Sequence, residues 1–390
     1  MAGNSADKIP LWLNPKFRNI GYQVAAMVLF ALLAGYLISN TLDNLERQKI
    51  ATGFGFLQKE SAFEIGESVI DYSSADTYGR ALVVGALNTL KVSFIGIIVT
   101  VVLGTFIGIA RLSRNWLVAR IAAVYIEVMQ NIPILLQLFF WYAIFYESLP
   151  SPRQALNPVK HLYLSNRGVV MAIPMPHPAY LYMLMAFAVA GLIAWRIRRR
   201  AKKRQAETGR LFPTGWITTA LLIGLPLTVW VLFGAPFALD IPQLTGFNFK
   251  GGVTLSPEFI ALLLGLVLYT AAFVAEAVRA GIQAVSKGQT EAAVSIGLKP
   301  SHVLNLVILP QALRVVIPPL TSQLLNLTKN SSLAVAIGYP DFVSVANTTI
   351  NQTGQSIEGV TLIMVVYLFF SLSTSLLMNW YNKKARLVER

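Results

Sequence analysis

Ionisable and amide side chains inside otherwise apolar stretches are the residues of this chain whose placement could support chemistry. Lys329 lies in the polar run 326–332, Asn-Leu-Thr-Lys-Asn-Ser-Ser, within a long apolar stretch. An ionisable group at the centre of a bilayer costs about 2.5–3.5 kcal/mol on insertion scales. Its ammonium group could meet the carboxylate of a passing solute, or it could pair with a buried acid or extend to the interface for structural reasons. Both interpretations stay open, and the candidate path residues here are Asn326, Lys329, Asn330 and Ser331.

A second polar group surrounds Pro133, which should break the helix that contains it. These side chains could contact the amino group or the side chain of a solute, and they are Glu127, Gln130, Asn131 and Gln137. Polar side chains also hold neighbouring membrane helices together, and this packing role is the favoured interpretation.

The residue types that many enzymes require are missing or scattered. The sequence has no cysteine, which excludes disulfides and thiolate metal sites, and His161, His177 and His302 lie far apart. Neither H-E-x-x-H nor the phosphate-binding pattern G-x-x-x-x-G-K-[ST] occurs. We therefore expect no catalytic residue, no metal site and no bound cofactor in this chain, and an integral-membrane enzyme is disfavoured.

Membrane-spanning helices must position these residues. Of the 390 residues, 55% are hydrophobic and only 13% are charged, and the mean hydropathy is +0.58, whereas soluble domains have about 25% charged residues. A hydrocarbon core about 30 Å thick needs about 20 apolar residues per helix. The sequence thus predicts an all-α polytopic membrane protein with eight spans, at 20–39, 88–110, 119–147, 178–195, 215–234, 257–278, 308–335 and 359–381. The first is interpreted as an uncleaved anchor because no small-residue cleavage site follows it.

Other charged and small residues in the spans have structural interpretations. Glu276 and Arg279, three residues apart on a helix, favour an ion pair over a gate. Lys91 and Arg314 are expected near span ends, without a special role. The pattern Gly104-x-x-x-Gly108 indicates close helix packing.

The placement of basic residues predicts the orientation. Most of the 32 Lys and Arg fall in the N-terminal tail, the C-terminal tail, 111–120, 196–210 and 279–299, which lie on one side if there are eight spans. Because cytoplasmic loops are enriched in Lys and Arg, both termini should be cytoplasmic. The dense run 196–204 should then touch anionic lipid headgroups rather than nucleic acid, and the acidic segment 41–87 should be periplasmic.

A short helix is predicted between the sixth and seventh spans. Ser286 and Gln289 fit a capping box at its start, and Gly297 and Pro300 fit its end. Ser301 could then cap the next helix. Prolines in that helix, at Pro310, Pro318 and Pro319, should kink it, so a cytoplasmic helix joined to a kinked span could act as a lever.

The spacing in this segment resembles the EAA loop of the permeases of ATP-binding cassette (ABC) importers. The matching residues are Glu291, Ala292, Ala293, Gly297, Leu309 and Pro310, and the one departure is Val307, where the family usually has Ile. The resemblance implies that 284–299 is a coupling helix that sits in a cleft of a separate ATP-binding subunit, with Gly297 at its turn and Glu291 on its contact side.

Further sequence words resemble the polar amino-acid permeases of that class. They include Asn88-Thr-Leu and Tyr125-Ile-Glu-Val in the first half and Lys329-Asn-Ser-Ser-Leu-Ala and Ile337-Gly-Tyr-Pro-Asp in the second. The resemblance implies a five-helix type I importer core split by an insertion, as in permeases of general L-amino-acid importers. The predicted divisions are 1–87 (tail, first span and periplasmic loop), 88–147 (first core part), 148–256 (insertion with two spans), 257–381 (second core part) and 382–390 (cytoplasmic tail).

The same resemblance implies the function and the partners. This chain would be a permease subunit for L-amino acids of polar or broad range in a bacterial inner membrane, working by alternating access. It would assemble with a second permease, in a heterodimer, with two ATP-binding subunits that use ATP and Mg²⁺, and with a periplasmic amino-acid-binding protein. The alternative is an ion-coupled secondary transporter, which usually has two repeated halves with matching broken helices. A single coupling-type loop without a second copy counts against it.

Overall fold

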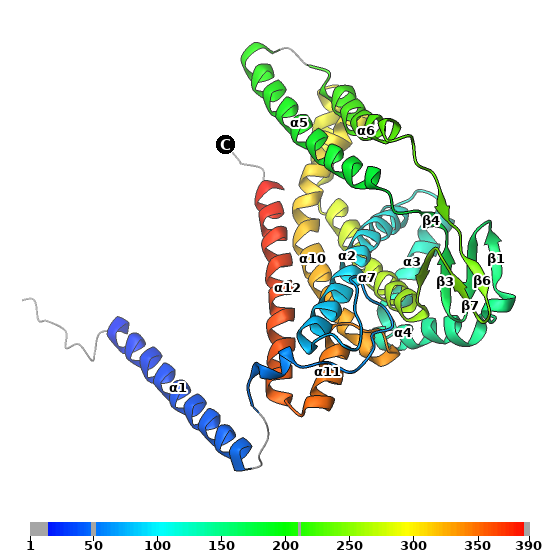
Figure 1. Ribbon diagram of the computed structural model, residues 1–390. Coiled ribbons are helices and arrows are strands. Elements are labelled where there is room, and N and C mark those ends of the chain that lie inside the picture. Colours follow the sequence, from blue (N-terminus) through cyan, green and yellow to red (C-terminus); the bar gives the residue numbers. More distant parts are fainter. Residues whose placement is uncertain (1–14, 48–51, 210–211, 386–390) are drawn as a thin grey trace, which may run out of the picture. The chain divides into compact units, whose positions relative to one another are not determined.

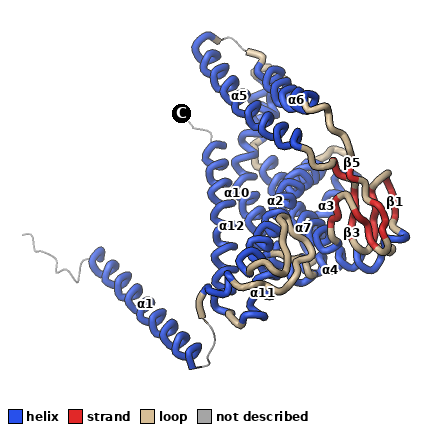
Figure 2. The backbone as a smooth tube through the Cα atoms, viewed as in Figure 1, coloured by secondary structure: helices blue, strands red, loops and turns tan. Residues whose placement is uncertain are grey.

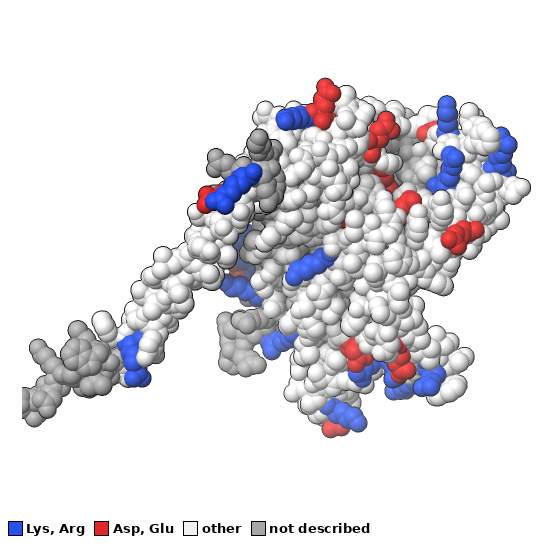
Figure 3. Space-filling view, turned by 90° about the horizontal axis from the view of Figure 1, so that it is seen from below, with Lys and Arg blue, Asp and Glu red and all other residues white. Residues whose placement is uncertain are grey.

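The computed structural model describes residues 15–47, 52–209 and 212–385, and the predicted N-terminal tail and the last residues of the C-terminal tail lie outside these ranges. Seven described helices are long and apolar enough to cross a membrane, or eight if a bent pair forms one span. The mostly helical, polytopic architecture is therefore confirmed. Charged side chains are sparse on the face shown in Figure 3, where wide uncharged areas separate them.

The spanning helices follow the predicted order. They are α1 (Pro15–Arg47), α2 (Tyr78–Arg111), α5 (Pro178–Thr208), α6 (Thr214–Leu232), α7 (Pro257–Gln283), α10 (Leu309–Asn330) and α12 (Ser356–Ala385). Five have longer bounds than predicted, and α6 and α10 have slightly shorter ones. Helix α2 begins well before the predicted start at 88 because Thr77 caps it, accepting a hydrogen bond from the Arg80 backbone N–H.

The predicted span 119–147 is not one continuous helix. It consists of α3 (Trp116–Asn131) and α4 (Ile134–Ala143), which is extended by the π-helical segment η3 (Ile144–Ser148). The two parts are bent by 103° at Pro133. The proline lacks an N–H and disfavours helical backbone in the residue before it, so the chain turns there instead of continuing.

The chain forms two compact units, each described separately. The first comprises residues 1–123 and 273–390, and the second comprises 124–272. In the first unit, α10 lies beside α12, and α11 (Phe342–Thr353) packs on α2 (Figure 1). One apolar cluster there joins the start of α2 to α11 through Ala81, Leu82, Phe342, Val345 and Ala346.

A second apolar cluster of the first unit joins α7 to α10. Val274, Val278 and Val316 are buried there. The helix axes approach closely at glycines: a Cβ on Gly281 would lie 2.3 Å from Val316 Cγ2, and one on Gly108 would lie 2.7 Å from the Ala275 carbonyl oxygen. The close packing predicted for the Gly104–Gly108 pattern is thus confirmed at Gly108.

The second unit contains the α5–α6 hairpin, whose helices lie side by side, and short strands, which cluster together in Figure 2. The larger sheet has the order β1-β2-β3-β8 and is antiparallel, with strands Leu156–Val159, Leu162–Ser165, Gly168–Met171 and Val253–Leu255. Two strand pairs follow, β4 (Ile173–Pro174) with β5 (Leu239–Asp240) and β6 (Gln243–Thr245) with β7 (Asn248–Lys250). These strands were not foreseen, because segments of at most four residues show too little alternation to be recognised.

Candidate functional site

The predicted coupling segment 284–299 contains the helix α8 (Lys287–Ser295). Its end agrees with the prediction. Gly297 has φ +80°, and the backbone N–H groups of Gly297 and Leu298 donate to the carbonyl oxygens of Val294 at 2.9 Å and Ala293 at 3.2 Å. This left-handed glycine and its two hydrogen bonds close the last turn, so the chain reverses immediately after α8.

The predicted caps at the start of α8 and of the next helix are wrong. Ser286 precedes α8, but its hydroxyl makes no capping bond, and the Gln289 side chain instead accepts from Gln311 Nε2 at 3.3 Å. The next helix, α9 (Pro300–His302), begins one residue before Ser301 and has Lys299 at its N-cap. Pro300 is favoured as the first helical residue because its φ is preset and its missing N–H needs no partner.

The faces of α8 differ in chemistry. Ala293 is buried, whereas the Glu291, Val294 and Ile296 side chains are exposed, with 75% of Ile296 accessible. This helix lies outside the candidate spans. Exposed branched apolar side chains beside a carboxylate are typical of a surface that another protein covers.

Consecutive helical segments, without an intervening loop, lead from this segment through the first unit. After α9 come the π-helical segment η5 (Val303–Ile308) and α10, which starts at Leu309 and Pro310 and contains Pro318 and Pro319. Helix α10 is about 33 Å long, from its residue count and a rise of 1.5 Å per residue. The Gln289–Gln311 contact therefore lies at one end of α10, and Lys329 lies at the other (Figure 1).

Lys329 lines a cavity of about 690 Å³ between the end of α10, the 3₁₀ segment η6 (Ser331–Ile337), α11 and α12. The other polar lining groups are hydroxyls, on Ser332, Thr361, Tyr367 and Ser371. Among the described residues, no Asp or Glu oxygen lies within 4.0 Å of Lys329 Nζ. Within the described part of the chain, Lys329 therefore does not form an ion pair with a buried acid.

The other candidate path residues of the run 326–332 do not share the cavity of Lys329. Asn326, Asn330 and Ser331 are absent from its lining, and the Ser331 hydroxyl donates to the Thr328 carbonyl oxygen at 2.7 Å. Sequence reasoning missed the lining hydroxyls of α12, because single Thr and Ser residues in an apolar span are common and only packing selects the ones that meet Lys329.

The polar residues around Pro133 make local contacts at the bend. Gln137 Nε2 donates to the carbonyl oxygens of Met129 and Ile132, both at 3.0 Å. Gln130 Nε2 donates to the Ala272 carbonyl oxygen on α7 at 3.3 Å, and Asn131 Nδ2 to the Glu127 carbonyl oxygen at 2.7 Å. These bonds agree with the packing role, because the Gln137 bonds satisfy carbonyl groups that the broken helix leaves free and the Gln130 bond joins α3 to α7. The Glu127 carboxylate is exposed, and its contact with a solute stays a prediction.

Two of the sequence segments that resemble the permease family contact each other in the first unit. Asn88 Nδ2 donates to the Pro340 carbonyl oxygen at 2.9 Å, and Thr89 Oγ1 accepts from the Phe342 N–H at 2.9 Å. Asn88 also donates to the Glu67 carbonyl oxygen at 2.7 Å. These buried hydrogen bonds hold the start of α2 against the start of α11 and tie the 52–77 loop to both.

Asp341 is the buried acid of this region. Its Oδ1 caps α11 by accepting from the Ser344 N–H at 2.8 Å, and its Oδ2 accepts from the Tyr367 hydroxyl at 3.0 Å. Burial raises the pKa of the Asp341 carboxyl to about 6, although its hydrogen bonds lower it. Asp341 ends the family-like segment 337–341, but no sequence pattern indicated that its carboxyl is buried.

The remaining charged residues in the spans were predicted with structural roles or with none, and the structure shows ion pairs for Glu276, Arg279 and Lys91. Glu276 and Arg279 form the expected pair, with Arg279 Nε 2.9 Å from Glu276 Oε2. Lys91 forms an ion pair with Glu67 of the 52–77 loop, so the expectation that it has no special role is wrong, whereas its place near a span end stays a prediction. Within the described residues, no cluster of three or more His, Asp or Glu side chains could hold a metal ion.

The amino-acid sequence of this chain is similar to that of known transport proteins over nearly its whole length. Residues 187–387, just over half of the chain, match the family described as "Binding-protein-dependent transport system inner membrane component". The chain is 50% identical to the general L-amino acid transport system permease protein AapQ of Rhizobium johnstonii, over 97% of this chain and 94% of that protein. It is also 50% identical to the amino-acid ABC transporter permease protein YhdX of Escherichia coli K12, over 97% and 96% of the two chains.

Two further likenesses are lower in identity. The glutamate/glutamine/aspartate/asparagine transport system permease protein BztB of Rhodobacter capsulatus is 43% identical over 96% of this chain and 95% of its own length. Among solved structures, an amino acid ABC transporter crystallised with histidines covers 79% of this chain and 95% of its own, at 21% identity and a TM-score of 0.46.

Proposed function

The chain belongs to the family of binding-protein-dependent transport system inner membrane components, as a permease subunit of an amino-acid ABC importer, and we propose that its substrates are L-amino acids of polar or broad range. The substrate range is supported by AapQ, a general L-amino-acid permease, and by BztB, a permease for acidic amino acids and their amides. As a transport component, the chain is not itself an enzyme.

The coupling role is assigned to Glu291, Ala292, Ala293, Gly297, Leu309 and Pro310. The observation that carries this proposal is the exposed acidic and apolar face of α8, a helix that is linked to α10 through Gln289 and Gln311. An ATP-binding subunit would cover Glu291, Val294 and Ile296. Ala293 packs inward, so a push on α8 would reach the chain around η5 rather than be absorbed by a loose loop.

Helix α10 would transmit the movement. Its prolines at Pro318 and Pro319 remove backbone donors, which lets the helix bend without breaking further hydrogen bonds. Closure of the ATPases, which use ATP and Mg²⁺, would displace 284–299. This movement would shift the position of the end of α10 that carries Lys329. In this scheme the cavity alternates between outward and inward access while this chain binds no cofactor.

The substrate path includes Lys329 and its cavity. An ammonium group among hydroxyls suits an amino-acid carboxylate, because a charge-assisted hydrogen bond is strong where water is scarce. The cavity volume lies in the range of small-molecule sites. Glu127, Gln130, Asn131, Gln137, Asn326, Asn330 and Ser331 remain candidates for other positions along the path.

The assembly would place this chain beside a second, different permease. A single coupling segment in the chain supports a paired arrangement, in which each permease contacts one of two ATP-binding subunits, and a periplasmic amino-acid-binding protein delivers the substrate. The concentration of Lys and Arg next to α5, α7 and the chain ends supports cytoplasmic termini in a bacterial inner membrane.

The coupling proposal is tested with Glu291→Lys and Gly297→Asp. The first reverses the charge on the exposed face of α8, and the second places a side chain at φ +80°, where glycine is favoured. Both should abolish uptake and substrate-stimulated ATP hydrolysis, while the variant chains still insert in the membrane. The matched control is Glu207→Lys, an exposed acid on α5 in the second unit.

Purification through a tag on this chain reports on the assembly in the same experiment. We expect mass spectrometry to find an ATP-binding subunit and a second permease sequence with the unmodified chain, and less ATP-binding subunit with Glu291→Lys. Normal transport by Glu291→Lys and Gly297→Asp would contradict the coupling assignment, and recovery of this permease alone would contradict the heterodimer.

A further inference from the structure

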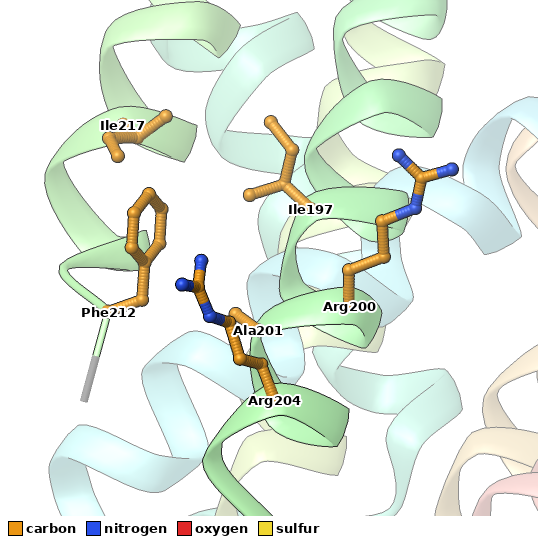
Figure 4. A pocket seen from close by; sticks show the side chains of 6 residues that line it. All are labelled: Ile197, Arg200, Ala201, Arg204, Phe212 and Ile217. Atoms are coloured by element: carbon orange, nitrogen blue, oxygen red, sulfur yellow. The ribbon is translucent and has the colours of Figure 1, made fainter. Parts of the chain in front are cut away.

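A small cavity lies between the end of α5 and the beginning of α6. It has a volume of about 270 Å³ and is lined by Ile197, Arg200, Ala201, Arg204, Phe212 and Ile217. The Arg204 side chain extends toward Phe212 in the space between the helices, whereas the Arg200 guanidinium group, one turn earlier on α5, points to the other side of Ile197 (Figure 4). The Arg204 guanidinium group thus lies among apolar lining side chains, and Arg200 borders the same cavity.

The two arginines differ from the charged residues around them. Lys203 lies 4.0 Å from Glu207, Arg198 donates to the Thr218 hydroxyl at 3.0 Å, and Arg199 lies over the Trp195 ring. Among the described residues, no carboxylate oxygen lies within 4.0 Å of Arg200 or Arg204. The basic run 196–204 leaves this cavity with an excess of positive charge.

The depth of the cavity follows from helix length. The apolar part of α5, residues 178–195, is about 27 Å long, close to the thickness of the hydrocarbon core. Ile197 and Arg200 therefore lie where the hydrocarbon ends and the lipid phosphates begin, and Arg204 lies about 6 Å farther from the hydrocarbon, a distance that its long side chain can span. Ile217 lies within the first turns of α6, whose apolar stretch enters the membrane from the same level.

These observations restrict the chemistry of an occupant. A free phosphate ion would use the guanidinium groups but would leave the apolar lining unmatched, and a neutral lipid would leave the charges unmatched. An amphiphile with an anionic head and an acyl chain satisfies both. We propose that this cavity is a binding site for an anionic phospholipid, whose phosphate contacts Arg204 and draws the Arg200 side chain toward it, and whose acyl chain lies against Ile197, Phe212 and Ile217. The site requires only that the chain be embedded in a bilayer, so it is independent of the coupling and substrate-path assignments.

The first test removes the two charges. The intact complex, purified through a tag on this chain, is titrated with phosphatidylglycerol and followed by native mass spectrometry. Each cation near an anionic headgroup contributes about fivefold in affinity, so Arg200→Gln with Arg204→Gln should weaken the tightest binding step by about 25-fold. The matched control is Arg199→Gln with Lys202→Gln, which removes the same charge from the side of α5 that faces away from Ala201 and should change this step by less than about fivefold.

The second test fills the cavity and keeps both arginines. Ala201→Phe should displace the acyl chain and also weaken the tightest phosphatidylglycerol step. Phosphatidylethanolamine should not occupy the site, and inorganic phosphate should not compete. Equal losses in the two charge variants, or a loss in neither, would overturn the proposal. An unchanged affinity in Ala201→Phe, or competition by inorganic phosphate, would overturn it as well, because binding would then be a general surface attraction.

Discussion

At the scale of residues, Lys329 is distinguished by what surrounds it. A lysine in a spanning segment can extend to the interface or pair with an acid. Here its cavity supplies hydroxyl groups from two other segments, η6 and α12, and apolar side chains between them. This environment keeps the ammonium group available to an anion that enters the cavity, which is the arrangement that a carboxylate ligand needs.

Lys329→Ala should raise the KM for amino-acid uptake. A hydrogen bond to a charged group contributes about 1.5–3 kcal/mol, which corresponds to an increase of about 10- to 100-fold. Lys329→Arg keeps the charge and should be affected less, and Lys203→Ala, on the exposed end of α5, is the control. Uptake kinetics with several amino acids measure the effect. An unchanged KM for all of them, with the complex intact, would return Lys329 to a structural role.

Asp341 should make stability depend on pH. Its carboxyl has an ordinary pKa of 3.8 and a folded pKa of about 6. Between these values the folded state binds the proton and the unfolded state does not, so stability falls as the pH rises, and the loss is complete above about pH 6. The difference corresponds to at most about 3 kcal/mol.

Thermal unfolding of the purified complex at pH 4.5 and 7.5 measures this dependence. Asp341→Asn can still accept the Ser344 N–H but does not titrate, so its melting temperature should fall less between the two values than that of the unmodified protein. Asp43→Asn, which alters an exposed acid on α1, should behave like the unmodified protein. An identical pH dependence in Asp341→Asn and the unmodified chain would show that Asp341 does not titrate in this window.

At the scale of elements, helix breaks organise the functional parts. Pro133 turns α3 into α4 at 103°, Gly297 reverses the chain after α8, and the π-helical η5 leads into α10. Freed carbonyl groups at the first break are satisfied by Gln137. The first break is thus compensated locally, and the backbone bonds of Gly297 and Leu298 close the turn at the second.

The contact between α2 and α7 is expected to tolerate no added side chain at Gly108. Gly108→Val would bring carbon atoms within 2.7 Å of the Ala275 carbonyl oxygen, so the helices must separate. Overpacking of this kind costs about 1–3 kcal/mol. The yield and melting temperature of the purified complex should fall. Gly191→Ala, at a glycine in α5 with open space around it, should have little effect, and a similar loss in both variants would contradict this packing argument.

At the scale of the whole molecule, the chain presents a surface that requires a bilayer. The spanning helices expose large apolar side chains along their length, including Phe30 on α1, Phe106 on α2 and Leu376 on α12. The low charge content leaves few groups to solvate such surfaces in water. We expect the orientation to depend on the basic residues at the helix ends and between the helices, such as the run 196–204 at the end of α5.

Because the chain has no cysteine, its orientation can be mapped with single introduced thiols. Ala75→Cys, in the 52–77 loop, should react with a membrane-impermeant maleimide on intact spheroplasts. Ala206→Cys and Ser301→Cys should react only after the membrane is opened. All three sites are exposed, so access depends on the side of the membrane. Labelling of Ser301→Cys in intact spheroplasts would contradict cytoplasmic placement of the coupling segment.

The sequence alone determined the features that depend on local interactions and on the solvent. Seven of the eight predicted spans follow from apolar length, since each corresponds to a helix long and apolar enough to cross a membrane. The end of α8 follows from Gly297 and Pro300, and the bend at Pro133 follows from a missing N–H. The Glu276–Arg279 pair is also local, since one helical turn joins the two residues. The coupling segment could be recognised for the same reason, because its residues lie within one short stretch.

Tertiary structure alone decided which distant residues meet. The Lys329 cavity depends on Tyr367 and Ser371 of α12, the Asn88 side chain finds Pro340, and Lys91 finds Glu67. Strand β8 completes a sheet begun far earlier in the chain, at β1 to β3. Such contacts are selected by the packing of whole helices and strands, so no local pattern specifies them. The polar residues in spans could therefore be named from the sequence, whereas their partners, and the burial that raises the pKa of Asp341, required the fold.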